Sequence, residues 1–252
     1  MRVTLLGCGT STGVPRLPDD WGRCDPLEPR NRRSRASVLV EAGGTTLLVD
    51  CGPDMRMQLM AARVARLDAV LVTHDHADHT HGIDDLRGYA MAQGKRIPLH
   101  APPEALRRLK LRFDYVFRER QGYPPICDGV EIDGPFRVGA IDILPFAQQH
   151  GTIVSLGFRF GDIAYSTDVS DLDEAAFAAL SGVRIWIVDA LREKPHPTHS
   201  HLEKTLGWID RVRPERAVLT HMSNMLDYRS LCEKLPAGIE PGYDGMTIES
   251  AH

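Results

Sequence analysis

The chain alternates short apolar runs with stretches in which apolar residues recur every three or four positions. The runs are rich in Val, Ile and Leu, which is typical of strands buried in a sheet. The Gly43-Gly44 pair separates two of these runs and indicates a hairpin. Strands are therefore expected at residues 2–7, 36–42, 45–52, 68–73, 136–146, 152–161, 162–168, 184–190 and 215–221.

The stretches with helical spacing lie between these strands. Pro53 suits the first turn of a helix, and Asp54 complements the positive end of the helix dipole. Because helices alternate with strands while hairpins also occur, the pattern predicts an α/β fold built as a layered α/β/β/α sandwich. Helices are expected at residues 53–67, 170–182 and 200–213, and a strand, a turn and a basic helix at residues 97–113.

Composition narrows the class of protein. The 252 residues are 42% hydrophobic and 25% charged, and no linker-like segment divides them, so one domain over residues 1–252 is expected. A formal net charge of −4 argues against extended nucleic-acid binding. Five scattered cysteines form no CxxC pair, and neither a leader peptide nor a membrane span is indicated, so a cytoplasmic location is expected.

The most informative stretch is "VLVTHDHADHTHGIDD", residues 70–85, where ligand-type side chains directly follow an apolar strand. His74, His76, Asp78 and His79 offer three imidazoles and a carboxylate within six residues. Nitrogen and oxygen donors without thiolates favour Zn²⁺, Mn²⁺ or a similar ion. The alternative is a solvated polar loop with incidental histidines, but four of the chain's eleven histidines lie within eight consecutive positions, which favours a metal site.

Other expected strands also end in possible ligands or supports for ligands. Asp50, Asp168, Asp189 and His221 each follow an apolar run. Loops at strand ends bring side chains from distant parts of a sequence into one cleft, so these residues are expected near the histidine-rich stretch. Asp50 and Asp189 are candidates for orienting ligand imidazoles, with capping of the strand ends as the alternative.

The His-x-His-x-Asp-His spacing at residues 74–79 resembles the metal motif of the metallo-β-lactamase superfamily. The pieces that follow have the order which that superfamily requires: His150 in "FAQQHGT", Asp168 in "AYSTDVS" and His221 in "VLTHMSN". Further segments, "GCGTSTGVPR", "NRRSRASVLVE" and "GYDGMTIE", resemble its phosphodiesterase branch. Within that branch the chain is most similar to the PhnP family of phosphoribosyl 1,2-cyclic phosphate phosphodiesterases, and more distantly to ribonuclease Z.

This resemblance implies a metallo-β-lactamase-type four-layer αββα sandwich, a homodimer and two divalent metal ions, zinc or manganese. The ligands that it implies are His74, His76 and His150 for one ion, Asp78, His79 and His221 for the other, and Asp168 as a bridge between them. Two cations that share a ligand can lower the pKa of a water molecule and so produce a hydroxide nucleophile. The chain is therefore expected to be a metal-dependent hydrolase, a phosphodiesterase acting on a small cyclic or nucleotide-like phosphodiester.

Phosphodiester hydrolysis also needs a proton for the leaving group, and the pKa of histidine suits this role. The segment "EKPHPTHSHLEKT" offers His196, His199 and His201. The resemblance favours His199, with His201 as the alternative. His199 and Asp78 are thus the catalytic candidates.

Other side chains leave two interpretations open. The basic run "PRNRRSRAS" at residues 29–37 either contacts a phosphate or forms a solvated surface. Tyr228 and Tyr243 either stack on a base or a sugar, or are buried aromatic residues.

Two departures from the family pattern leave the substrate open. Only Cys24 lies in "WGRCDPLEP", where related enzymes carry a cysteine-rich structural zinc site, and no basic arm for tRNA is inserted. A small phosphodiester is therefore the expected partner, with no long nucleic acid and no membrane. The alternatives are another hydrolase of the superfamily, such as a thioesterase or a tRNA-processing endonuclease, and a non-catalytic nucleotide-binding scaffold.

Overall fold

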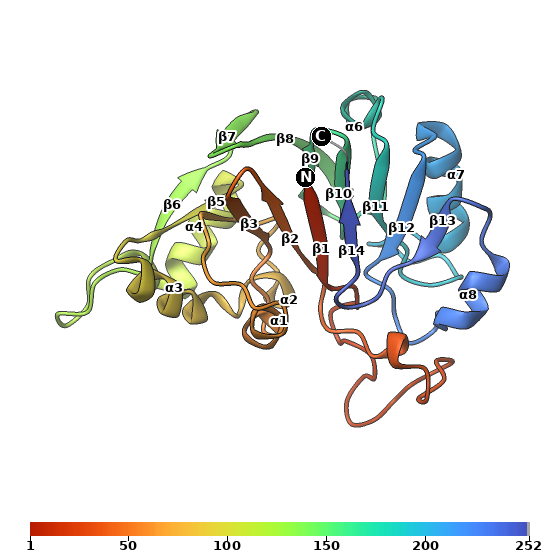
Figure 1. Ribbon diagram of the computed structural model, residues 1–252, viewed down its shortest axis with the longest axis horizontal. Helices are drawn as coiled ribbons and strands as arrows, with labels where there is room; N and C mark the ends of the chain where they lie inside the picture. Colours follow the sequence, from red (N-terminus) through yellow and green to blue (C-terminus); the bar gives the residue numbers. More distant parts are fainter. Residues whose placement is uncertain (251–252) are drawn as a thin grey trace.

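Two mixed β-sheets pack face to face in the computed structural model, which describes residues 1–250 (Figure 1). The first sheet has the order β14-β1-β2-β3-β4-β5-β6, with β1 (Arg2–Gly7), β2 (Ser37–Ala42), β3 (Thr45–Val49), β4 (Ala69–Leu71), β5 (Ile97–Ala101), β6 (Cys127–Glu131) and β14 (Thr247–Glu249). The second has the order β13-β12-β11-β10-β9-β8-β7, with β7 (Phe136–Val138), β8 (Ile141–His150), β9 (Ile153–Phe160), β10 (Ile163–Ser166), β11 (Ile185–Asp189), β12 (Arg216–Thr220) and β13 (Ile239–Pro241).

Helices cover the outer face of each sheet (Figure 1). Those on the side of the first sheet are α1 (Met55–Ala61), α2 (Ala77–Thr80), α3 (Leu86–Gln93), α4 (Pro103–Arg112) and α5 (Asp114–Phe117). Those on the side of the second are α6 (Glu174–Leu180), α7 (Leu202–Val212) and α8 (Tyr228–Lys234). Two layers of strands between two layers of helices confirm the αββα sandwich expected from the sequence.

The central strands are apolar at nearly every position because both of their faces are covered. In β2, Val38 and Val40 belong to the core between the sheets, whereas Leu39 lies in the core under the helices of the first sheet. In β3, Leu48 faces those helices and Val49 faces the second sheet. Strands buried on both faces show continuous apolar runs rather than alternation, as the sequence does.

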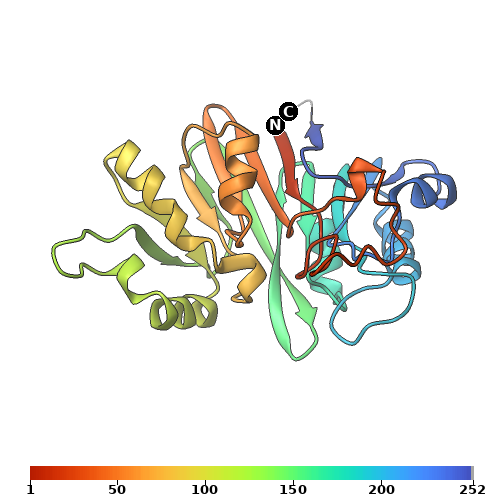
Figure 2. The same cartoon turned by 90° about the horizontal axis from the view of Figure 1, so that it is seen from below.

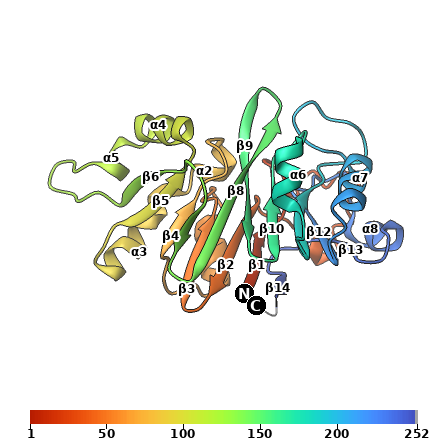
Figure 3. The ribbon, with the colours of Figure 1, turned by 90° about the horizontal axis from the view of Figure 1, so that it is seen from above.

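The direction of the strands decides where the polar residues that follow them lie. Strands β3 and β4 run parallel, as do β10, β11 and β12. The carboxyl ends of parallel neighbours lie at one edge of a sheet, where crevices form. In the views from below and above (Figures 2 and 3), the long β8–β9 hairpin lies between the helices of the first sheet and those of the second. Its first strand, β8, ends at His150.

Some elements differ from the expectation. The helix expected over residues 53–67 ends at Ala61, because Arg63 has a left-handed φ of 54° and the chain turns toward β4. The strand expected at 136–146 is divided into β7 and β8 by a turn at Gly139 and Ala140. The short elements α2, α3, α5, α8, β6, β13 and β14 have no clear periodicity and are not anticipated. Across residues 1–250, no helix is both long enough and apolar enough to cross a membrane.

Gly52, in the turn between β3 and α1, packs against the backbone of the histidine-rich loop. A Cβ at this position would lie 2.0 Å from the carbonyl oxygen of Asp78. The Cys51 N–H donates to the His79 carbonyl at 2.8 Å, and the Gly82 N–H donates to the Cys51 carbonyl at 2.8 Å. The two loops therefore cannot separate without losing backbone hydrogen bonds.

We expect Gly52→Ala to lower the free energy of unfolding by about 1–3 kcal/mol, the usual cost of overpacking. The matched control is Gly88→Ala in α3, where an added Cβ meets nothing within 4 Å. Urea unfolding monitored by circular dichroism measures both. Equal midpoints for Gly52→Ala and the parent chain would contradict this close approach.

Candidate metal centre

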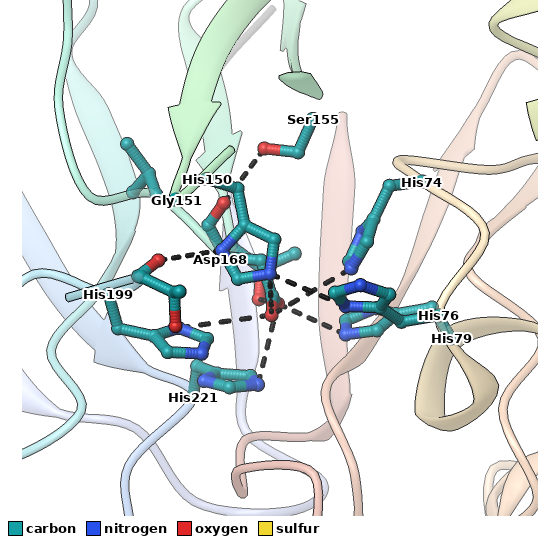
Figure 4. Close-up of polar contacts among 12 residues, drawn as sticks. His74, His76, His79, His150, Gly151, Ser155, Asp168, His199 and His221 are labelled. Atoms are coloured by element: carbon teal, nitrogen blue, oxygen red, sulfur yellow. Dashed lines mark hydrogen bonds and ion pairs between the residues drawn. The ribbon is translucent and has the colours of Figure 1, made fainter. Parts of the chain in front are cut away.

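The polar residues that follow the strands converge at one edge of the sandwich (Figure 4). Asp50 follows β3, Asp168 lies two residues after β10, and His221 follows β12. All three have a left-handed backbone, with φ values of 64°, 53° and 56°. Residues other than glycine seldom adopt this conformation, which costs about 1–3 kcal/mol. The chain thus carries backbone strain at three strand exits that turn side chains toward a common point.

Two groups of possible metal ligands share Asp168. The first group is His74, His76, His150 and Asp168, and the second is Asp78, His79, Asp168 and His221. Within each group the donor atoms lie within 4.8 Å of one another. The fold therefore brings together all seven residues that the sequence analysis assigns to two metal ions.

The two carboxylate oxygens of Asp168 face different groups. Its Oδ1 lies 3.9 Å from Nε2 of His74 and 3.7 Å from Nε2 of His150. Its Oδ2 lies 3.0 Å from Nε2 of His79 and 3.4 Å from Nε2 of His221. A carboxylate placed in this way can offer one oxygen to each of two cations.

Hydrogen bonds behind the histidines determine which ring nitrogen faces the centre. Asp50 accepts from His79 Nδ1 at 2.7 Å and from the Thr73 hydroxyl at 2.9 Å. Because that hydroxyl has only one proton, it accepts from His74 Nδ1, 3.0 Å away. In both histidines the Nε2 atom is left to bind a cation or, without one, a further proton.

The remaining nitrogens also point to bound cations. His150 Nδ1 donates to the Thr198 carbonyl at 2.6 Å, which again leaves Nε2 for the centre. The Nε2 atoms of His74, His79 and His221 are buried and have no hydrogen-bond partner among residues 1–250. Buried polar atoms without a partner are rare, and these three face one carboxylate. Divalent cations would satisfy all three, so the residues present fit a metal centre.

Electrostatics differ between the two groups. Burial lowers the pKa of His74 and of His150, so both imidazoles are neutral near pH 7, as metal ligands must be. Burial also opposes the charge on His79 and His221, but the carboxylates around them outweigh it and raise the pKa of His221 to about 9. The charged histidines in turn hold the pKa of Asp168 well below its usual range, against its burial. Without cations, protons on the second group therefore balance the buried carboxylates.

A cavity of about 350 Å³ opens onto the two groups. In addition to the ligand candidates His76, Asp78, His150 and Asp168, it is lined by Ser11, Thr152, Ile153, Thr198 and His199. The sequence analysis misses the three hydroxyl residues, because Ser and Thr are common in loops. Their positions are the only available signal: Thr152 lies two residues after a ligand candidate, and Thr198 immediately precedes His199.

Of the three histidines considered as proton donors, His199 lines this cavity. Its Nδ1 lies 3.1 Å from Oδ2 of Asp189 and 3.8 Å from Oδ1 of Asp168. Its ring stacks on that of His221, with centroids 4.7 Å apart and an interplanar angle of 14°. Asp189 thus contacts an imidazole of the site, and it also accepts the N–H of Val169 at 3.1 Å.

The other candidates from the sequence lie outside the cavity lining. His196 accepts from the backbone N–H of Thr198, and His201 precedes the first residue of α7. Tyr228 and Tyr243 pack against each other with centroids 6.0 Å apart, beside the guanidinium of Arg30. These two tyrosines therefore have a packing role.

Two arginines of the basic run at residues 29–37 hold loops together. Arg33 is 1% exposed and donates to the Ser223 carbonyl at 3.2 Å. Arg35 pairs with Asp54 at 2.8 Å. For Arg33 both interpretations of the run are wrong, because its side chain is buried and bonded within the protein. Arg35 stays partly exposed, so the solvated-surface interpretation remains open for it.

A four-layer sandwich with a carboxylate between two histidine-rich groups at its edge defines a class of metal-dependent hydrolases. The family model for the β-lactamase superfamily domain matches residues 45–222, and the chain belongs to this superfamily.

Solved structures support this assignment. A crystal structure described as a new diphosphatase from the PhnP family is similar over 99% of this chain and 97% of its own, with a TM-score of 0.92 and 34% sequence identity. Human short-form tRNase Z is similar over 99% of both chains, with a TM-score of 0.72. Its sequence identity of 20% shows the fold alone.

Curated relatives include proteins with two different names. A Porphyromonas gingivalis protein named octanoyltransferase is 35% identical over an alignment of 254 positions, which covers 98% of this chain and 51% of that protein. A ribonuclease Z of a Bradyrhizobium species is 32% identical over an alignment of 150 positions, which covers 52% of this chain and 46% of that protein. The chain therefore spans about half the length of these curated relatives.

Removal of metal is expected to make the stability depend on pH in a defined direction. The pKa of His221 is about 9 in the folded chain without cations and about 6.5 in an unfolded chain. Its contribution to stability is therefore complete below about pH 6.5 and is lost as the pH rises through about 9. Linkage limits the loss to about 3 kcal/mol.

Urea unfolding of chelator-treated protein between pH 6 and pH 9.5 measures this loss. Zinc-loaded protein is the control, because coordination replaces the proton on His221 and removes this dependence. A metal-free chain that gains stability over the same range would contradict the assigned charges.

Proposed function

We propose that the chain is a phosphodiesterase that hydrolyses a small cyclic or nucleotide-like phosphodiester with the help of two divalent cations. The observation that carries this proposal is the position of Asp168, whose two oxygens face two separate groups of ligands. The 34% identity to a PhnP-family diphosphatase over 99% of the chain supports chemistry at phosphorus.

The metal ligands are assigned by group. They are His74, His76 and His150 for one cation, Asp78, His79 and His221 for the other, and Asp168 for both. When bound, divalent cations activate water and neutralise the charge that develops on phosphoryl oxygens. The protein's own contribution is orientation, since Asp50 and Thr73 hold the rings of His79 and His74 from behind.

His199 is assigned as the proton donor to the leaving oxygen. With its Nδ1 directed at Asp189, its Nε2 is the nitrogen left for the substrate. The buried carboxylate of Asp189 fixes the orientation of the ring, as a carboxylate does behind a catalytic histidine. Asp78 also lines the cavity, so it is assigned both as a ligand and as a residue next to the substrate.

Cavity size favours a small substrate. A volume of about 350 Å³ lies at the lower end of ligand sites, close to the size of a sugar phosphate or a mononucleotide. A tRNA-processing endonuclease is the second candidate, supported by the ribonuclease Z relative that matches 52% of the chain. The octanoyltransferase name describes a protein of which the chain covers 51%, and acyl transfer forms no part of the proposal.

The finer parts of the proposal are the metal, the assembly and the location. Zinc or manganese is proposed because all donors are nitrogen or oxygen.

All five cysteines are free and four are buried, which supports a reducing cytoplasm. Met57 and Met60 of α1 are 67% and 58% exposed, which supports a homodimer. Light scattering tests the dimer, and a mass of 28.0 kDa would contradict it.

Asp168→Ala is expected to abolish diesterase activity, because the variant loses the carboxylate that both cations share. Release of p-nitrophenol from bis-p-nitrophenyl phosphate with added Mn²⁺ or Zn²⁺ should fall by more than about a hundredfold, beyond the effect of losing an outer support. The control is Asp171→Ala, an exposed carboxylate in the same loop that pairs with Lys204 at 3.1 Å. A metal-loaded parent chain without diesterase activity would reject the proposal.

His199→Gln separates the proton donor from the metal ligands. We expect kcat to fall about 10²–10⁴-fold on 2′,3′-cyclic nucleotides or phosphoribosyl cyclic phosphate, whose alkoxide leaving groups need a proton. The loss should be much smaller on bis-p-nitrophenyl phosphate, because p-nitrophenolate leaves without one. His201→Gln is the control, and the same pattern in that variant would move the assignment to His201.

A further inference from the structure

The ligand candidate His76 differs from His74, His79 and His150 in how its ring is held. His74, His79 and His150 each direct Nδ1 to a hydroxyl, a carboxylate or a carbonyl behind the ring. His76 is exposed, and its Nδ1 has only the Nε2 of another ligand candidate, His150, at 3.4 Å. Its position must therefore be set by its backbone.

Arg112, at the end of α4, contacts the peptide unit that precedes His76. Its Nη1 donates to the Asp75 carbonyl oxygen at 2.6 Å, and its Nη2 donates to Asp75 Oδ2 at 2.7 Å. Arg108, one turn earlier, reaches Asp75 Oδ1 at 3.4 Å. Asp75 lies between two ligand candidates in sequence and is only 5% exposed, so two arginines compensate a nearly buried charge.

The other side of His76 is also held. Its carbonyl oxygen accepts the Thr80 hydroxyl at 2.8 Å and the His79 N–H at 3.2 Å. Arg112 supplies the only side-chain contact to the carbonyl on the preceding side among the residues that the structure describes. A bidentate, charge-assisted contact of this kind restricts both the carboxylate and the backbone.

We propose that Arg112, supported by Arg108, is a positioning residue for the cation held by His74, His76 and His150. The contact with Asp75 replaces the hydrogen bond that the ring of His76 lacks. We expect it to act mainly on this group, because Asp50 holds the ring of His79 and His221 follows another strand, β12. The proposal rests on the assignment of two cations made above.

Zinc-binding isotherms of the parent chain and of Arg112→Met, measured by competition with a chelator, test the proposal. The parent chain should bind two zinc ions. In Arg112→Met one of them should bind about 10- to 100-fold more weakly, the usual effect of losing an outer support. The other should be unchanged. Arg112→Lys keeps the charge but only one point of contact. Its affinity for that ion should lie between those of the parent chain and Arg112→Met.

The matched control is Arg107→Met. Arg107 lies on the same helix, is exposed, and pairs within the described part of the chain with Glu104 alone. Asp75→Asn is a second variant, which weakens the carboxylate contact while Arg112 stays in place, and it should weaken the same ion to a smaller degree. Thermal unfolding of each metal-free variant tests whether that variant folds.

Two outcomes overturn the proposal. One is an unchanged two-ion isotherm in Arg112→Met, and the other is an equal weakening of both ions, which would indicate general destabilisation. Failure of the two-cation assignment is distinguishable from both, because the parent chain itself would then fail to bind two ions. Failure of the proposed function is distinguishable as well, because a parent chain that binds two ions would then lack diesterase activity.

Discussion

The structure depends on neutralising the buried carboxylates that lie at the ends of its strands, at one edge of the sandwich. Asp50, Asp168 and Asp189 are at most 2% exposed. An ionised carboxylate removed from water costs many kcal/mol unless it is paired. Imidazoles and main-chain N–H groups provide part of the pairing, and protons or cations on the histidines provide the rest. The buried carboxylates at this edge therefore require bound protons or cations.

Much of the fold and of the ligand set can be predicted from the sequence because both have local signals. Asp50 and His221 directly follow apolar runs long enough to be strands, and the order of such runs indicates alternating layers. Parallel pairing then carries residues from distant parts of the chain to one edge. The spacing at residues 74–79 completes the set, since it is dense in donors of one chemical type.

The remaining features have no local signal. That the two oxygens of Asp168 face different groups depends on a rotation of its side chain that only the packed sheets determine. The hydroxyl groups in the cavity come from loops whose composition is ordinary. The contact between Arg112 and Asp75 joins residues separated by 37 positions on elements that pair only after folding. The burial of Arg33 in the basic run at residues 29–37 is also not predictable from local sequence, because Arg33 contacts Ser223 in a loop distant in the chain.

The left-handed backbone at Asp50, Asp168 and His221 limits how this centre could be transplanted into a designed scaffold. Copying the seven proposed ligands onto an ideal parallel sheet would orient these three side chains as in a regular strand, roughly perpendicular to the sheet, because regular strand exits have negative φ. A designer would have to reproduce three unfavourable backbone turns at once. The penalty would total roughly 3–9 kcal/mol, which most small engineered proteins could not tolerate without a larger core.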